Sequence, residues 1–244
     1  MNFSRLLFSL LLIAASVSAE THSDRYSVSV TSLKVPSEAK KEYRNGCSAI
    51  EKQDWRKAAD HFSKAVEIYP RYAEAYNNLG AAYVHLGDPQ KGREAFQHAL
   101  EADDHFAAAL VNIAQTEIAE HNFGSAESHL VRAVSADPTS MTTLTLLSNV
   151  QLLAQHYDDA IATSRKAHLM PHENALVHYV AARALLHKSR VAEAVDECKL
   201  FLQEEPTGPR AEAVRREMLQ LSDISAALHS EGLQSDFRRS IRPF

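Results

Sequence analysis

Residues 73–83 read Ala-Glu-Ala-Tyr-Asn-Asn-Leu-Gly-Ala-Ala-Tyr, and they lie just before a tight turn, His85-Leu-Gly-Asp-Pro89. Large apolar residues recur along this stretch with the spacing of a helix face, around the small residue Gly80. Two helices approach to about 8–10 Å only where small side chains lie at their crossing point. The stretch therefore predicts the first helix of a closely packed pair, and the second helix follows the turn and contains Phe96 and Ala99.

The same arrangement recurs along the chain with a period of 34 positions. Two columns of small residues align under this period: Gly46, Gly80, Ala114, Ser148 and Ala182 in the first, and Ala58, Gly92, Ala126, Ala160 and Ala194 in the second. Pro70, Pro138 and Pro206 keep the same period and end second helices, because proline cannot donate a hydrogen bond to the preceding turn. A single helix pair cannot bury its apolar face, so the pattern predicts stacked pairs that share a core.

Residues 73–83, together with Phe96 and Ala99, closely resemble a tetratricopeptide repeat (TPR). Five such units follow one another over residues 37–206, and the fifth departs from the pattern at Cys198 and Phe201, where an aromatic residue and an alanine are usual. The resemblance implies an all-α fold, a right-handed superhelical solenoid of antiparallel helix pairs. It also implies that the first helix of each pair lines a concave groove.

Composition excludes several other classes of protein. The 244 residues include 26 Lys and Arg against 31 Asp and Glu, so no basic excess is available to neutralise nucleic-acid phosphates. Two cysteines form neither a disulfide framework nor a four-ligand zinc site. Cys47 and Cys198 lie four repeats apart, about 40 Å at about 10 Å per repeat, and are expected to stay unbridged.

Residues 1–19 have the features of a secretory signal peptide. Arg5 precedes a short apolar run, and small residues end the segment at Ala19. The run is shorter than the roughly 20 residues of a membrane-spanning helix, although an uncleaved anchor is the alternative. We therefore expect an exported protein, periplasmic or secreted, with no stable membrane insertion after cleavage. Residues 20–36 are predicted to be a flexible leader, with a short strand near Val28 as the alternative.

A capping helix is predicted at residues 207–221, after the fifth unit. Ala211, Val214, Met218 and Leu221 form its apolar stripe, and its other face is charged. The open end of a solenoid needs such a polar-backed cap for solubility. Residues 222–244 are predicted to be a partly helical or mobile tail, whose basic and aromatic end is either a docking peptide or a frayed terminus.

The chain contains no recognisable catalytic motif. It has no glycine-rich phosphate loop, nucleophile elbow or paired zinc-binding histidines on one helix, so we assign no catalytic residue, no metal site and no cofactor. His168 and His172 have metal-like spacing, but Pro171 interrupts the helix between them, and the alternative is that this histidine-rich region is a solvated surface. The thirteen histidines also suggest that partner affinity changes between about pH 5.5 and 7.

The resemblance places a partner-binding groove on the first helices. Its predicted polar lining is Arg44, Asn77, Asn78, Asn112, Gln115, Asn149, Tyr179 and Arg183, and its predicted apolar lining is Val111, Ile118, Leu152, Leu176 and Leu186. The basic residues of a two-carboxylate clamp are not at the matching positions, so recognition of a C-terminal carboxylate is not expected. An Asn amide both donates and accepts, so Asn78 and Asn112, one repeat apart, are expected to pair with a peptide backbone.

Two classes of function remain from the sequence. The first is an exported, non-enzymatic scaffold that binds a peptide or protein partner in the groove, in cell-envelope assembly. The alternative is a metal-binding or enzymatic protein that uses the solenoid as a frame. A tightly bound metal that is lost when His168 or His172 is replaced would favour the alternative.

Overall fold

The computed structural model describes residues 35–170 and 174–231 of the chain. Within these ranges the chain forms eleven α-helices and no strand, which confirms the predicted all-α fold. The helices are α2 (Ser37–Glu51), α3 (Trp55–Ile68), α4 (Ala73–His85), α5 (Pro89–Ala102), α6 (Ala107–Ala119), α7 (Phe123–Ala136), α8 (Met141–Leu153), α9 (Tyr157–His168), α10 (Leu176–His187), α11 (Val191–Glu204) and α12 (Pro209–Glu231). None of them has the length and apolar character needed to cross a membrane.

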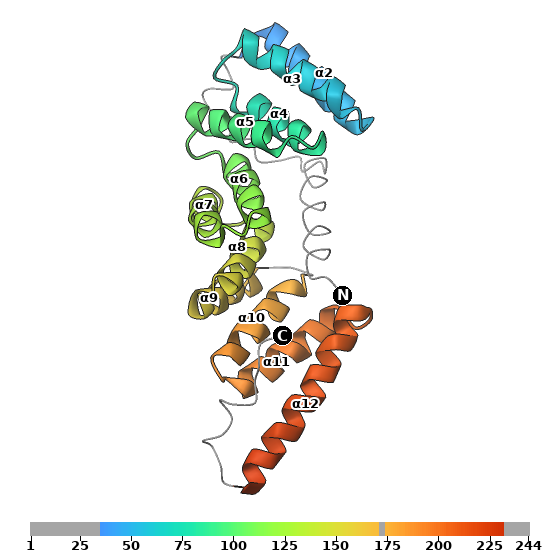
Figure 1. Ribbon diagram of the computed structural model, residues 1–244, viewed down its shortest axis with the longest axis vertical. Coiled ribbons are helices and arrows are strands. Elements are labelled where there is room, and N and C mark those ends of the chain that lie inside the picture. Colours follow the sequence, from blue (N-terminus) through green and yellow to red (C-terminus); the bar gives the residue numbers. More distant parts are fainter. Residues whose placement is uncertain (1–34, 171–173, 232–244) are drawn as a thin grey trace. The chain divides into compact units, whose positions relative to one another are not determined.

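The helices fall into two compact units that meet in the sequence at Pro138. The first unit holds three helix pairs, α2/α3, α4/α5 and α6/α7, and the second holds α8/α9, α10/α11 and the long helix α12 (Figure 1). Within each unit, successive pairs pack side by side, α3 on α4 and α5 on α6 in the first, and α9 on α10 in the second. The predicted pairing of helices is therefore confirmed in both units.

The turn inside each helix pair contains one residue with left-handed backbone conformation. These residues recur every 34 positions: Gln53 (φ 57°), Gly87 (φ 82°), His121 (φ 62°), Gln155 (φ 66°) and Ser189 (φ 59°). The amide of the next residue donates back to a carbonyl of the first helix, as from Asp54 to Ala49 and from Asp88 to Tyr83, both at 2.9 Å. This pattern commonly ends a helix at glycine. Four of these five turns use another residue, at a cost of about 1–2 kcal/mol each.

Side-chain hydrogen bonds cap the first turn of several helices. Asp54 accepts from the amide of Lys57 at the start of α3, and Asp88 accepts from the amide of Lys91 at the start of α5, both at 3.1 Å. In the second unit, Ser140 accepts from the amide of Thr143 at the start of α8. Each cap satisfies one of the amides that a helix leaves unpaired at its first turn.

The first column of small residues makes room for an aromatic ring of the same repeat. A Cβ atom on Gly46 would lie 2.6 Å from Phe62, and one on Gly80 would lie 2.5 Å from Phe96 and 2.8 Å from the carbonyl oxygen of Gly92. Real Cβ atoms do not approach other atoms so closely. The predicted role of small residues at the helix crossings is therefore confirmed.

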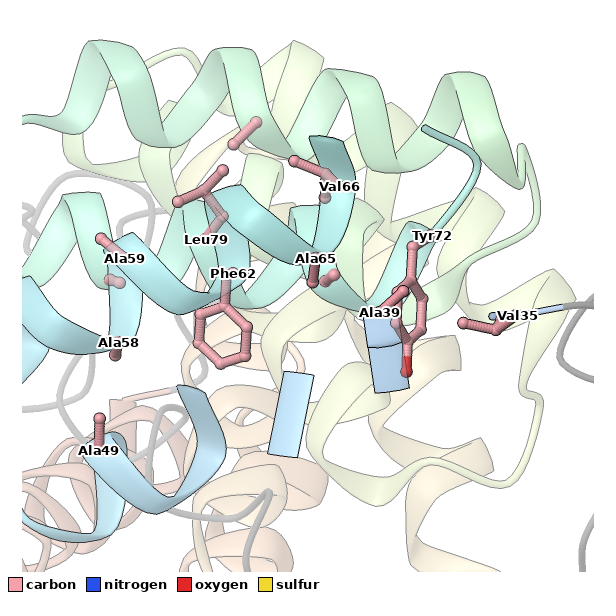
Figure 2. Packing of buried hydrophobic residues seen from close by; sticks show 13 residues of the cluster. Val35, Ala39, Ala49, Ala58, Ala59, Phe62, Ala65, Val66, Tyr72 and Leu79 are labelled. Atoms are coloured by element: carbon pink, nitrogen blue, oxygen red, sulfur yellow. The ribbon is translucent and has the colours of Figure 1, made fainter. Parts of the chain in front are cut away.

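The core of the first unit surrounds Phe62, whose side chain is fully buried. Figure 2 shows its ring on α3, with Ala58 and Ala65 on the same helix, Ala49 on α2 and Leu79 on α4, all members of one apolar cluster. Burying a phenylalanine side chain contributes about 1.5–3 kcal/mol. Alanines on the neighbouring helices let the ring fill the space between them.

Helix α12 covers the last pair of the second unit. Its buried residues Ala211 and Val214 share an apolar cluster with Cys198 and Phe201 of α11. The first residue of α12, Pro209, lies one full period after the N-cap of α10, so α12 takes the register of a sixth first helix. It continues to Glu231, whereas the cap was predicted to end at residue 221.

Several predictions fall on residues that the structure does not describe. They are the signal peptide at 1–19, all but the last two residues of the leader at 20–36 with its alternative strand, the end of the tail from 232 to 244, and His172. Each of these remains a prediction.

Candidate functional site

The predicted groove residues divide between the two units. Arg44 lies on α2, Asn77 and Asn78 on α4, and Asn112 and Gln115 on α6, so the first unit holds five of them. The second unit holds Asn149 on α8 and both Tyr179 and Arg183 on α10. All eight lie on first helices of their pairs. Arg44 is exposed, Asn77 is buried, and the other six are half-buried.

Four side chains of the first unit form a chain of hydrogen bonds across three helices. Nδ2 of Asn112 donates to Oδ1 of Asn77 at 2.8 Å, and Nδ2 of Asn77 donates to Oδ1 of Asn78 at 3.4 Å. Nδ2 of Asn78 then donates to Oη of Tyr43 at 3.1 Å. We call these four residues the amide chain. It links α6 to α4 and α4 to α2, and thus joins three consecutive repeats.

The two bonds between helices are repetitions of one contact. Asn77 occupies in the second repeat the position that Tyr43 occupies in the first. Asn112 likewise occupies in the third repeat the position that Asn78 occupies in the second. Each bond therefore joins one position of a repeat, that of Tyr43 and Asn77, to the following position in the next repeat, that of Asn78 and Asn112. Tyr43 was not among the predicted lining residues. The spacing of 35 residues, common to Tyr43–Asn78 and Asn77–Asn112, is the sequence signal that could have identified it.

Burial determines the protonation state of Tyr43, the last member of the amide chain. Burial is the main cause that raises the pKa of Tyr43 far above its usual value, so its hydroxyl stays protonated. That hydroxyl accepts from Asn78. Burial also raises the pKa of the thiol of Cys47, on the same helix. Cys47 is thus a protonated, weakly reactive thiol packed against the core of the first unit.

The amide chain leaves polar atoms available to a ligand. Only 8% of Asn77 is exposed, whereas Asn78 and Asn112 are half-buried and keep one side toward solvent. An Asn amide has two N–H donors and an oxygen with two lone pairs. Asn112 uses one N–H within the chain, so its oxygen and second N–H remain, and Asn78 keeps its second N–H.

The charged groove residue of the second unit is already paired. Nη1 of Arg183 lies 2.7 Å from Oε1 of Glu217 on α12, and both side chains are about 30% exposed. Tyr179 packs on the ring of Phe201, with ring centres 5.9 Å apart. Helix α12 therefore neutralises the positive charge that the sequence offered to a partner at this position.

Two of the predicted apolar lining residues belong to the core instead. Ile118 is 6% exposed and Leu186 is 7% exposed, so neither presents a surface to a partner. Both lie on the last turn of their helices, where neighbouring helices cover them. Val111, Leu152 and Leu176 are half-buried, as a lining residue must be.

The histidine-rich region is not simply solvated. His178 on α10 is 2% exposed, and its Nδ1 lies 2.8 Å from Oε2 of Glu197 on α11. Its Nε2 lies 3.5 Å from Glu204, and the ring of His168 packs edge-on with centres 4.8 Å apart. The interpretation of this region as surface histidines is therefore wrong for His178, because acidic partners on α11 allow the imidazole to be buried.

One turn of the first unit brings together three groups that could hold a cation. One ligand atom each of Asp103, Asp104 and His105, between α5 and α6, lies within 4.8 Å of the others. Asp104 and His105 are exposed, and the imidazole lies 2.6 Å from the Asp104 carboxylate. Exposed acidic turns of this kind are common without a metal ion.

The chain matches one family model over most of its length. Residues 37–222 match the model described as the C-terminal ARM domain of tetratricopeptide repeat protein 21. The uncharacterised protein MJ0572 of Methanocaldococcus jannaschii is 34% identical over 70 residues, which cover 29% of this chain and 81% of that protein. The DnaJ homolog subfamily C member 7 homolog of Dictyostelium discoideum is 25% identical over 122 residues, which cover 48% of this chain but only 23% of that protein.

Solved structures share the fold at low sequence identity. YrrB, described as a TPR protein with an unusual peptide-binding site, superposes with a TM-score of 0.64 at 16% identity, over 72% of this chain and 90% of YrrB. PilF of Pseudomonas aeruginosa gives a TM-score of 0.65 at 19% identity, over 83% of this chain and 93% of PilF. MamA gives a TM-score of 0.62 at 20% identity, over 69% of this chain and 92% of MamA.

Proposed function

The chain belongs to the tetratricopeptide-repeat family, and we propose that it is a protein-interaction scaffold that binds an extended peptide segment of a partner protein along the first helices of its first unit. The observation that carries this proposal is the amide chain. Its half-buried members Asn78 and Asn112 present polar atoms at equivalent positions of consecutive repeats. We assign the protein no catalytic residue.

The spacing of these amides suits an extended backbone. Helices that pack side by side lie about 8–10 Å apart, which is roughly the length of three extended residues. A backbone that runs across α4 and α6 can therefore meet both amides in register. Because an amide recognises N–H and C=O groups, this contact is independent of the partner's side chains. The half-buried Val111 on α6 adds an apolar contact nearby.

A peptide selected from a library tests this proposal before the partner itself is identified. A library of displayed dodecapeptides is panned on the full chain, and the affinity of one selected peptide is measured for wild type and for the Asn78→Ala/Asn112→Ala double variant. We expect the double variant to bind about 1–3 kcal/mol more weakly, because it lacks the backbone contacts. Gln97→Ala, on the exposed surface of α5, is the matched control. Equal affinity of all three proteins for the peptide rejects this site.

We also propose that the chain is exported and that its partner is a protein of the cell envelope. The support is the sequence of residues 1–19, which has the charge, apolar run and small residues of a cleavable signal. N-terminal sequencing of protein recovered from the exported fraction is expected to begin at Glu20. Recovery of a chain that still begins at Met1 contradicts the cleavage.

A stoichiometric metal in the purified protein would instead favour the metal-binding alternative.

A further inference from the structure

Asn77 is the member of the amide chain that a ligand reaches least. It is only 8% exposed, yet its amide joins the two more accessible ones. Its Oδ1 accepts from Asn112 at 2.8 Å, and its Nδ2 donates to Asn78 at 3.4 Å. The first bond is short and the second is close to the limit of a hydrogen bond. Asn77 therefore restrains Asn112 more strongly than it restrains Asn78.

Tyr43 has the corresponding role at the other end of the chain. Its hydroxyl accepts from Nδ2 of Asn78 at 3.1 Å, and its ring packs against those of Phe62 and Tyr72 with centres 5.6 Å and 5.1 Å apart. Aromatic packing of this kind holds the ring in one place. Asn78 is thus oriented by a rigid group on the preceding first helix.

These bonds decide which atoms of the two accessible amides face a ligand. Asn112 directs one N–H inward to Asn77, so its oxygen and its second N–H are left, and this oxygen is the one that the amide chain does not already use as an acceptor among the two accessible amides. In Asn78 both the oxygen and one N–H are already engaged, so a single N–H is left to donate. An amide that rotates freely offers either atom, whereas one whose orientation is fixed in advance binds without the entropic cost of ordering.

We infer that Asn77 and Tyr43 are positioning residues for the proposed peptide site, and that they impose a polarity on the bound backbone. A backbone N–H of the ligand donates to Asn112, and a backbone C=O accepts from Asn78. This inference rests on the proposed function. It adds the two residues that orient the site and the atom types that each amide recognises.

The first test needs no ligand. Side-chain amide hydrogen exchange is measured by NMR in the full chain. Asn77→Leu, which removes both of its bonds at similar volume, is expected to speed exchange at Asn112 about tenfold, as loss of one hydrogen bond implies. Asn77→Asp keeps the oxygen that Asn112 needs and is expected to leave that exchange within about twofold, since only the donor is lost. Unchanged exchange at Asn112 in Asn77→Leu overturns the positioning role.

The second test uses the selected dodecapeptide. Asn77→Leu and Tyr43→Phe are each expected to weaken its binding about fivefold to tenfold, which matches the net worth of one hydrogen bond. Helicity and melting temperature are followed in parallel. Asn77→Asp is the conservative variant, because it keeps the oxygen that orients Asn112, and the peptide is expected to keep its contact with Asn112 in this variant. If Asn112→Ala weakens binding but Asn77→Leu and Tyr43→Phe do not, the inference fails while the proposed function stands.

The polarity is tested on the peptide itself. Replacing one backbone amide at a time by an ester removes a single N–H donor without changing side chains. One position is expected to lose about tenfold in affinity, and this loss should vanish in Asn112→Ala but persist in Asn78→Ala, because only the N–H to Asn112 is removed. The reverse dependence overturns the polarity. A peptide insensitive to both alanine variants rejects the proposed site itself.

Discussion

Gly80 and Gly124 are both helical glycines, but they have opposite surroundings. A Cβ on Gly80 meets the ring of Phe96 and the backbone of Gly92, whereas a Cβ on Gly124 meets nothing within 4 Å. Alanine favours a helix over glycine by about 1 kcal/mol. We expect Gly80→Ala to lower the free energy of unfolding by about 1–3 kcal/mol, since overpacking outweighs that gain. Gly124→Ala is expected to raise it by up to about 1 kcal/mol.

Urea denaturation followed by circular dichroism measures both changes. Gly124→Ala is the internal control, because it makes the same chemical change in a helix of the same unit. A stabilising effect of Gly80→Ala would mean that α4 and α5 do not approach as closely as their facing glycines indicate.

The groove residues show what a periodic sequence reveals about single side chains. Asn77, Asn78 and Asn112 were predicted from their positions on first helices, and the structure links them to one another. The hydrogen bonds among them were not predicted. Shifting the sequence by 34 residues compares residues at equivalent positions of the repeats, whereas the bonds between helices join residues that are 35 positions apart. Tyr43 was missed for the same reason.

A polar pair joins the two helices of four repeats, always through the same position of the second helix. The pairs are Glu42–His61 at 2.7 Å, Glu117–His129 at 2.9 Å, Gln151–Thr163 at 2.7 Å and His178–Glu197 at 2.8 Å. The first and last pairs occupy equivalent positions with acid and imidazole exchanged. A contact between helices is therefore retained although neither residue is.

This exchange predicts the behaviour of a swapped pair. His61→Glu places two carboxylates opposite each other at a half-buried site and should lower the free energy of unfolding. Adding Glu42→His recreates the arrangement of His178 and Glu197, and we expect it to restore most of the loss. A double-mutant cycle in urea should give a coupling energy of about 0.5–3 kcal/mol, as for residues in contact. Strictly additive effects would mean that the pair contributes nothing to the hairpin.

Helix positions were predictable from the sequence, but these pairs were not. The position of Glu42 holds Tyr76, Leu110, Leu144 and His178 in the later repeats. Only leucine recurs there, and no polar residue type does, so this column of the repeat does not indicate a polar contact. The left-handed turns were hidden in the same way, because only Gly87 among the five has the expected residue. Backbone geometry is retained between repeats where residue identity is not.

At the scale of the whole molecule, the period does not mark the division into units. The repeat spacing passes through Pro138 without change, although the chain divides there into two compact units. Each unit nevertheless contains one copy of the same stacked pair. The ring centres of Trp55 and His85 are 3.7 Å apart in the first unit, and those of Tyr157 and His187 are 4.5 Å apart in the second.

Both stacked histidines make stability depend on pH in the same direction. Burial lowers the pKa of His85, and burial followed by the charge of Arg183 lowers the pKa of His187. His85 ends a helix, where the helix dipole favours a positive charge, so burial is the stronger effect there. Each imidazole binds its proton more weakly in the folded chain than in the unfolded one. Their contribution to stability is therefore complete above the unfolded pKa of about 6.5 and is lost as the pH falls below it.

The stack on Trp55 allows this prediction to be measured at one site. Trp55 is the only tryptophan of the chain, and a protonated imidazole in contact with an indole quenches its fluorescence. We expect the emission of the folded protein to fall with acidification at a midpoint below about 6.5, the value of a free histidine. His85→Gln should abolish this step and flatten the decline of melting temperature between about pH 7 and 5.5, because it removes an imidazole that takes up a proton on unfolding. His105→Gln, at an exposed imidazole of the same unit, should leave the fluorescence step in place, because the stack on Trp55 is made by His85. A fluorescence midpoint above about 6.5 would contradict this prediction. It would mean that the indole face and the end of the helix stabilise the charged form of the His85 imidazole. The contribution of His85 to stability would then be lost as the pH rises instead of as it falls.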